Sequence, residues 1–151
     1  RPQKHWTQGA WSELGRRLHD EWGLTPLLLG GPGEVDAGQR IEAASGGAVR
    51  NLAGRTDIAA AAALVAGARL VVGVDTGLTH MGVAAGVPTL ALFGSTCPYL
   101  SAPGRPLTVL YHGLSCSPCK RSPSCGGAHP CLTGIGVDEV LRSIPAEAAI
   151  R

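Results

Sequence analysis

Alternation between short apolar runs and helical segments constrains the fold of this chain more than any other feature. The run 69–74 has the continuous, β-branched character of a strand that is buried on both faces of a parallel sheet. A helical pattern follows at 76–86 and another apolar run at 88–94. The same order recurs, with further predicted strands at 24–31, 48–52 and 106–112 and further predicted helices at 7–23, 34–47, 54–68 and 136–147. This alternation predicts an α/β fold, a doubly wound parallel sheet with helices on both faces.

Composition supports that architecture and bounds the class of protein. Ala, Val, Leu and 22 glycines dominate while only 4% of residues are aromatic, which suits close packing of helices on a sheet. A chain of 151 residues is expected to form one domain, 1–151, with its own core. Thirteen basic and eleven acidic side chains form no basic stripe, so we expect no nucleic-acid partner.

The sequence patterns of membrane spans and signal peptides indicate where a protein is located. The sequence has no run of 18 apolar residues and no signal-peptide pattern, so we expect a soluble, cytoplasmic protein without a membrane span. Because the sequence begins at Arg1 and its first pattern is a helix, we also expect it to be part of a longer chain.

The segment "DTGLTH", between two predicted core elements, is the first candidate site. Ligands of doubly wound sheets bind at the carboxyl ends of the strands, and helix N-termini there favour anions. Thr76 and Gly77 could therefore offer backbone N–H groups and a hydroxyl to a phosphate, Asp75 could accept from sugar hydroxyls, and His80 could donate to either. In the alternative interpretation, Asp75 is an ordinary helix N-cap and His80 a satisfied polar residue beside the core.

Two common nucleotide fingerprints are absent. No "GxGxxG" follows the first predicted strand, and "GGPGE" at 30–34 matches neither that pattern nor "GxxxxGK[ST]". A nicotinamide enzyme or a P-loop nucleotidase is therefore disfavoured.

Taken in order, several motifs resemble the C-terminal half of family 9 glycosyltransferases, the heptosyltransferases of lipopolysaccharide core assembly. They are "RPQKHW", "LLLGGPGE", "NLAGRTDI", "ARLVVGVDTGLTHMGVAAGVPTLALFGSTCPYLSAPG" and "CSPC". The resemblance implies a Rossmann-like domain, the donor-binding half of a GT-B enzyme, whose donor is typically ADP-heptose.

The same resemblance implies roles for further residues. Lys4 would contact the donor phosphates or the transferred sugar, which suits a compact ammonium facing a diphosphate. Glu34 would accept from the ribose hydroxyls, although a first-turn carboxylate that favours its helix dipole is nearly as good an explanation. Thr56 lies where the family contacts the base, and Asp75, Thr76, Gly77 and His80 match the family's diphosphate and sugar motif.

The resemblance also implies that some parts of the active site lie outside this chain. The general base and the surface for the lipid A-Kdo acceptor would lie in an N-terminal domain, so we expect no catalytic residue here and no transfer by this chain alone. The implied reaction is inverting transfer of heptose from ADP-heptose to the lipopolysaccharide inner core. It requires no metal, and the metal-binding "DxD" motif is absent.

A cysteine-rich segment at 114–133 needs a separate hypothesis. Cys116, Cys119, Cys125 and Cys131 follow the spacing C-x2-C-x5-C-x5-C, with His129 nearby. Four thiols could hold a structural zinc, although this spacing matches no standard zinc pattern well and free or partly oxidised thiols are favoured.

Two alternative functions remain open. One is another GT-B sugar-nucleotide enzyme, such as an epimerase of UDP-sugars, which preference for UDP over ADP would reveal. The other is a non-catalytic metal-binding module in which the cysteine-rich segment is the functional part.

Overall fold

A computed structural model describes residues 1–96, 103–120 and 122–149. The chain divides into two compact units, one formed by Thr7–Ala61 and the other by Arg1–Trp6 together with Ala62–Arg151. The first six residues thus belong with the later part of the chain. The prediction of a single domain over 1–151 stays a prediction.

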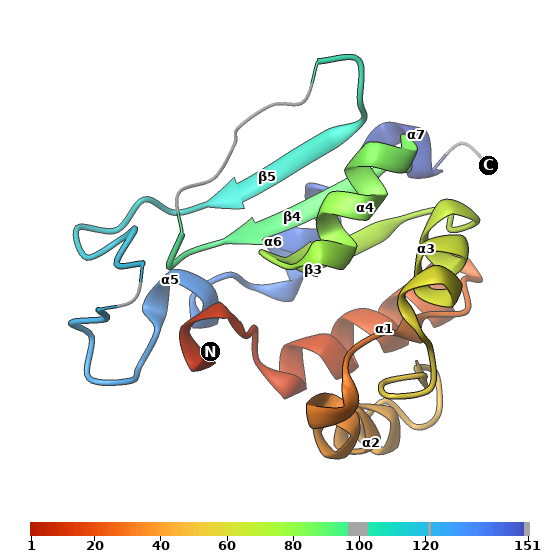
Figure 1. Ribbon diagram of the computed structural model, residues 1–151, viewed down its shortest axis with the longest axis horizontal. Helices are drawn as coiled ribbons and strands as arrows, with labels where there is room; N and C mark the ends of the chain where they lie inside the picture. Colours follow the sequence, from red (N-terminus) through yellow and green to blue (C-terminus); the bar gives the residue numbers. More distant parts are fainter. Residues whose placement is uncertain (97–102, 121, 150–151) are drawn as a thin grey trace. The chain divides into compact units, whose positions relative to one another are not determined.

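The unit Thr7–Ala61 contains helices packed on short parallel strands (Figure 1). Its elements are α1 (Gln8–Trp22), β1 (Leu27–Leu28), the 3-10 helix η2 (Pro32–Glu34), α2 (Val35–Ala44) and β2 (Arg50–Asn51). Strands β1 and β2 pair in parallel. The predicted first helix is confirmed: the Thr7 hydroxyl accepts a hydrogen bond from the Ala10 N–H, and Gly23 ends the helix with φ 64°.

The larger unit is built on a three-stranded parallel sheet in the order β3–β4–β5. These strands are β3 (Val71–Val74), β4 (Thr89–Phe93) and β5 (Leu107–Tyr111). Every residue of β4 is buried, whereas β3 and β5 are partly covered. The sequence predicted that 69–74, which contains β3, is buried on both faces, but the fully buried strand is β4. Within this three-stranded sheet, β4 is the central strand and has a hydrogen-bonded neighbour on each side.

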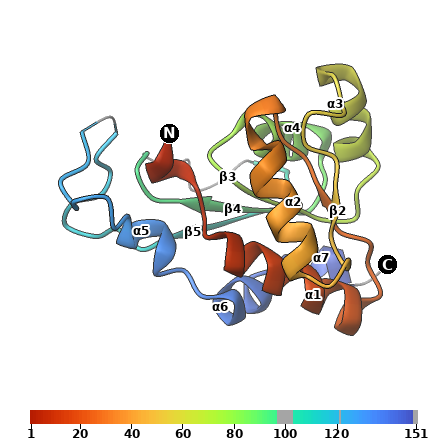
Figure 2. The same ribbon diagram turned by 90° about the horizontal axis from the view of Figure 1, so that it is seen from below.

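Helices lie on both faces of this sheet. Figure 2 shows α4 (Gly77–Ala85) on one face and the short helices α5 (Pro130–Thr133) and α6 (Val137–Arg142) on the other. The parallel pairing and two-sided cover confirm the α/β class, although hydrogen bonds join the strands as separate groups, β1–β2 and β3–β4–β5.

Two predicted helices begin or end as their local residues dictate. Helix α3 (Ile58–Ala66) is capped by the Asp57 carboxylate, which accepts from the Ala60 N–H at 2.7 Å. The single closing helix expected at 136–147 is wrong: α6 ends at Arg142, and a separate helix, α7 (Ala146–Ala149), follows Pro145. A proline lacks the N–H and disfavours helical backbone in the preceding residue, which accounts for the break.

Close packing at Gly73 shapes the end of β3. A Cβ at Gly73 would lie 2.1 Å from the Thr79 hydroxyl oxygen. That hydroxyl donates to the Val74 carbonyl at 2.6 Å and so joins the first turn of α4 to the strand. The glycine therefore lets helix α4 begin directly against the carboxyl end of β3.

Candidate functional site

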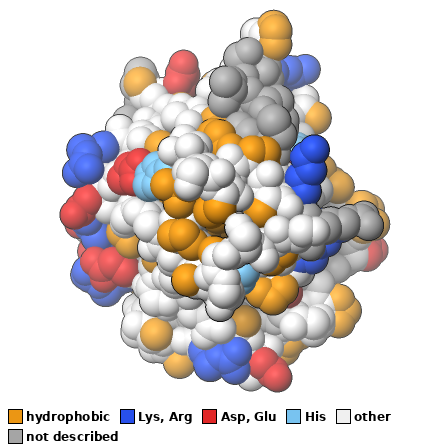
Figure 3. Space-filling model, turned by 90° about the vertical axis from the view of Figure 1, so that its left-hand side faces the viewer, with side chains coloured by type: hydrophobic (Ala, Val, Ile, Leu, Met, Phe, Trp, Pro, Cys, Tyr) orange, Lys and Arg blue, Asp and Glu red, His pale blue; other side chains and the backbone are white. Residues whose placement is uncertain are grey.

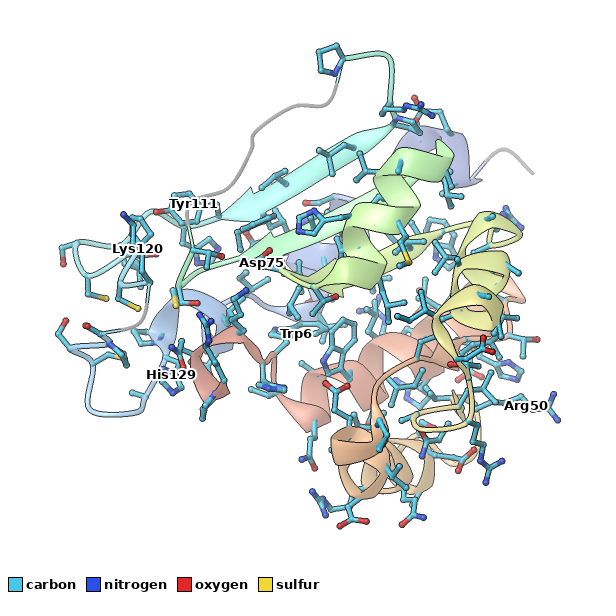
Figure 4. The ribbon with its side chains drawn as sticks, viewed as in Figure 1. Trp6, Arg50, Asp75, Tyr111, Lys120 and His129 are labelled. Carbon is cyan, nitrogen blue, oxygen red and sulfur yellow. The ribbon has the colours of Figure 1, made fainter. Side chains whose placement is uncertain are left out.

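A cluster of four side chains lies at the carboxyl edge of β3 and β4. Asp75 follows β3 directly, Thr96 lies three residues beyond β4, and Lys4 comes from the 3-10 helix η1 (Pro2–Lys4). The Lys4 ammonium lies 2.5 Å from Asp75 Oδ2, which also accepts from the Thr96 hydroxyl at 2.8 Å. His80 Nε2 lies 3.1 Å from Asp75 Oδ1. Figure 4 shows Asp75 at the end of its strand.

The charge of Asp75 is stabilised by these contacts. Burial alone would raise the pKa of its carboxyl group, but hydrogen bonds from Lys4, Thr96 and His80 and the charge of Lys4 outweigh that effect. The pKa of Asp75 is consequently below its ordinary value. The carboxylate is therefore ionised at neutral pH and can act as an acceptor for hydroxyl groups.

This lowered pKa gives a pH-dependent contribution to stability. Ionised Asp75 stabilises the folded state above its unfolded pKa of about 3.9, and the contribution is lost as pH falls through the lower folded pKa. We expect Asp75→Asn to lower the free energy of unfolding by about 1–3 kcal/mol at pH 7. The difference between the two proteins should shrink below about pH 4. Urea unfolding at pH 7, 5, 4 and 3 measures it; a difference that is unchanged at pH 3 would contradict the assignment.

The start of α4 lies beside the cluster. Thr76 is its N-cap and Gly77 its first residue, so the alternative in which Asp75 is the N-cap is wrong. Both residues are exposed, and within the described residues the Thr76 side chain makes no capping hydrogen bond. Thr76 N donates to the Val74 carbonyl at 2.7 Å. The helix therefore presents exposed backbone at its positive end next to a cation, an arrangement suited to an anion.

Two predicted site residues lie in the other unit. Glu34 Oε2 accepts from the Gly31 N–H at 2.7 Å, and Glu34 stands in the first turn of η2, as the helix-dipole explanation expects. Thr56 is half-buried and precedes the capping residue Asp57. The proposed contacts of Glu34 and Thr56 with ribose and base stay predictions.

Thr96 is the member of the cluster that sequence reasoning missed. The segment "ALFGSTCPYLSAPG" is a polar strand end at the ligand edge, and that position was the available signal. Choosing Thr96 within it required the side-chain contact with Asp75. Cys97 and the rest of this segment through 102 lie outside the described residues.

The cysteine-rich segment at 114–133 lies close to the same edge. Its four cysteines are free thiols, and Cys125 Sγ lies 3.6 Å from His129 Nδ1. In the described ranges no group of three or more His, Cys, Asp or Glu side chains is arranged to hold a metal ion, so the geometry does not support the structural zinc. Figure 4 shows sulfur atoms on the side that carries Lys120 and His129. Figure 3 shows hydrophobic side chains gathered over the middle of that face.

These thiols should differ in reactivity. Burial raises the pKa of the Cys131 thiol, and Cys119, Cys116 and Cys125 raise it further because neighbouring thiolates disfavour another negative charge. We expect iodoacetamide at pH 8 to modify Cys131 more slowly than the three half-buried cysteines. Mass spectrometry of peptides from timed aliquots measures the order, with the unfolded chain as the control in which the rates converge. Equal rates in the folded chain would contradict the prediction.

Fold and cluster together define a class of protein. A Rossmann-like α/β domain with a cation, a carboxylate and a helix N-terminus at the carboxyl edge of its strands is of the class that binds anionic ligands at that edge. The family model "Glycosyltransferase family 9 (heptosyltransferase)" matches residues 1–127. The chain belongs to this family.

Relatives and solved structures agree with that assignment. Lipopolysaccharide heptosyltransferase 1 of Pseudomonas aeruginosa is 38% identical over 117 residues, covering 77% of this chain and 32% of the relative. The structure of Escherichia coli ADP-heptose lps heptosyltransferase II has a TM-score of 0.78 and 27% identity, covering 97% of this chain and 43% of that one. E. coli heptosyltransferase WaaC with ADP-2-deoxy-2-fluoro heptose has a TM-score of 0.68 and 29% identity over 94% of this chain and 38% of that one.

These matches confirm the expected Rossmann-like fold of GT-B heptosyltransferases. The chain spans between 32% and 43% of the length of these three proteins. None of the helices in the described part of the chain combines the length and apolar character that a membrane crossing needs.

Proposed function

We propose that this chain is the donor-binding half of an enzyme that transfers heptose from ADP-heptose to the inner core of lipopolysaccharide. The observation that carries the proposal is the cluster of Lys4, Asp75 and His80 beside the start of α4. Family membership supports the choice of donor. So do the names of the two E. coli structures, one of an ADP-heptose heptosyltransferase and the other of a heptosyltransferase with ADP-2-deoxy-2-fluoro heptose.

Lys4 is suited to hold the donor diphosphate. An ammonium has three N–H donors, and Lys4 uses two of them on Asp75, one on Oδ2 and one on the backbone carbonyl at 3.2 Å. The third can donate to a phosphate oxygen. As the sugar leaves, negative charge grows on the diphosphate, and a cation held in place beforehand stabilises that charge.

Asp75 is suited to bind the sugar rather than the phosphates. Its two oxygens offer about four acceptor positions, of which Lys4, Thr96 and His80 occupy three. One position is then left for a sugar hydroxyl. His80 Nε2 lies 3.1 Å from Asp75 Oδ1, so the imidazole ring is held beside the carboxylate that would bind the sugar.

In the proposed reaction, transfer of the heptose also needs groups that lie outside this chain. Gly77 would bind the diphosphate through its backbone N–H group and Thr76 through its hydroxyl, since the Thr76 N–H already donates to the Val74 carbonyl. Glu34 and Thr56 would bind the ribose and base. The general base and the lipid A-Kdo acceptor surface are assigned to a separate N-terminal domain. No cofactor enters this scheme. We place the whole enzyme in the cytoplasm, peripheral to the inner membrane, because its acceptor is a lipid.

Calorimetric titration of the chain with ADP and with UDP tests the proposal. We expect saturable binding of ADP that exceeds binding of UDP and weakens in Asp75→Ala. Stronger binding of UDP would favour another GT-B sugar-nucleotide enzyme. Binding of neither nucleotide by a folded chain, as checked by circular dichroism, and by a longer protein that includes the N-terminal domain would contradict the donor-site assignment.

A further inference from the structure

We propose that Thr96 is a positioning residue that fixes the carboxylate of Asp75 and, through it, the ammonium of Lys4. The inference rests on the proposed function, because it assigns Thr96 to the donor site. Its first observation is direct: the Thr96 hydroxyl lies 2.8 Å from Asp75 Oδ2, the oxygen that Lys4 contacts at 2.5 Å. An ionised carboxylate can only accept, so the threonine donates.

Two donors on one oxygen define the plane of the carboxylate. The terminal torsion of an aspartate side chain is broad, and contacts with a flexible lysine and with the exposed ring of His80 on the other oxygen fix it poorly. Thr96 has a short, β-branched side chain with restricted χ1, so its hydroxyl is a firmer reference point than an ammonium on a four-carbon stem. Without Thr96, Asp75 and Lys4 would still pair but in a wider range of orientations.

The backbone before Thr96 is itself held in place. The Ser95 carbonyl accepts from the Lys120 N–H at 2.6 Å, and the Gly94 carbonyl accepts from the Ser117 hydroxyl. Ser95 is 1% exposed. The cysteine-rich segment therefore braces the strand end from which Thr96 reaches Asp75.

The same brace extends to the segment that carries Lys4. Lys120, in a left-handed conformation with φ 55°, accepts at its carbonyl from the Gln3 side-chain amide at 3.3 Å. The Trp6 indole N–H donates to the Ile135 carbonyl at 3.0 Å. The peptide groups of Lys120 thus join the strand end before Thr96 to the residue before Lys4. The backbone of Lys120 therefore holds both segments from which Thr96 and Lys4 reach Asp75.

Replacing the hydroxyl without changing the shape of the side chain tests this role. In Thr96→Val we expect the pKa of Asp75, followed by the NMR titration of its side-chain carboxyl carbon, to rise because one donor to the ionised form is lost. We expect the affinity of the chain for ADP to fall about tenfold, the effect of one hydrogen bond to a charged group. Thr96→Ser, which keeps the hydroxyl, should restore both values toward those of the parent chain, and Thr96→Ala serves as a second variant without it.

Thr89→Val is the matched control. Thr89 is buried at the opposite end of β4, and its hydroxyl donates to the Val87 carbonyl at 2.8 Å. Its replacement should lower stability while leaving the Asp75 titration and ADP affinity unchanged. If Thr96 had only a structural role, Thr96→Val would likewise lower stability and leave the Asp75 titration and ADP affinity unchanged, and that result would overturn the inference. A shifted Asp75 titration with unchanged ADP affinity would overturn it as well. Absence of ADP binding by the parent chain and by the longer protein would instead contradict the proposed function, and the Asp75 titration would still decide whether Thr96 holds the carboxylate.

Discussion

Replacing Lys4 by alanine is expected to weaken ADP binding by about 10- to 100-fold, the loss that corresponds to one charge-assisted contact with the diphosphate. The ammonium stands 2.5 Å from Asp75, so its removal also leaves that carboxylate without its cation. The bound diphosphate would then face Asp75 without a positive charge between them. Calorimetric titration with ADP at fixed ionic strength measures the change.

Two variants make the Lys4 experiment specific. Arg142→Ala removes one positive charge from an exposed position on α6 and should leave ADP affinity nearly unchanged. Lys4→Arg keeps the charge but replaces a compact ammonium by a planar, longer group, and should recover only part of the affinity. Similar losses in Lys4→Ala and Arg142→Ala would mean that net charge, rather than a positioned cation, governs binding.

The replacement Gly73→Ala is expected to lower the free energy of unfolding by about 1–3 kcal/mol. The added Cβ would lie 2.1 Å from the Thr79 hydroxyl oxygen, which is buried and hydrogen-bonded to Val74. Relief of that clash requires Thr79 to move, together with the first turn of α4. Urea unfolding measures the loss, and the position of α4 beside Asp75 predicts that ADP affinity falls too.

Gly9 provides the matched control for that substitution. A Cβ at this position in α1 would meet nothing within 4 Å, and Gly9 is exposed. Gly9→Ala should therefore be neutral or stabilising by up to about 1 kcal/mol, because alanine is the better helix former. If both variants were equally stable, the close packing at Gly73 would not be a constraint.

Local patterns were sufficient to predict most of the secondary structure. The bounds of the predicted helices 7–23 and 76–86 fall on residues that cap those helices in the structure, namely Thr7, Gly23, Thr76 and Gly86. Capping depends on residues within one turn, so such bounds can be predicted locally. The break before α7 was missed because the apolar spacing of 136–147 continues across Pro145. The difference in burial between β3 and β4 could not be predicted, since it depends on which strands are neighbours.

The candidate site was predictable only in part. Asp75 and His80 follow from the position of "DTGLTH" at a strand end, and they do lie together. The choice of Lys4 came from the family resemblance, because nothing local links residue 4 to residue 75. Thr96 and the contacts of Lys120 depend on chain segments far apart in the sequence, and no periodicity reports such pairs.

The separation of these partners along the chain also sets the order in which the site can form. Lys4 meets Asp75 across 71 residues, Gln3 meets Lys120 across 117, and Trp6 meets Ile135 across 129. Loops of that length close late, because their entropic cost precedes any gain from the contact. During synthesis from the N-terminus, the unit Thr7–Ala61 can begin to fold while the first six residues still await their partners. Lys4 is thus made before the segments that it contacts, and it reaches its working position only after they have been made.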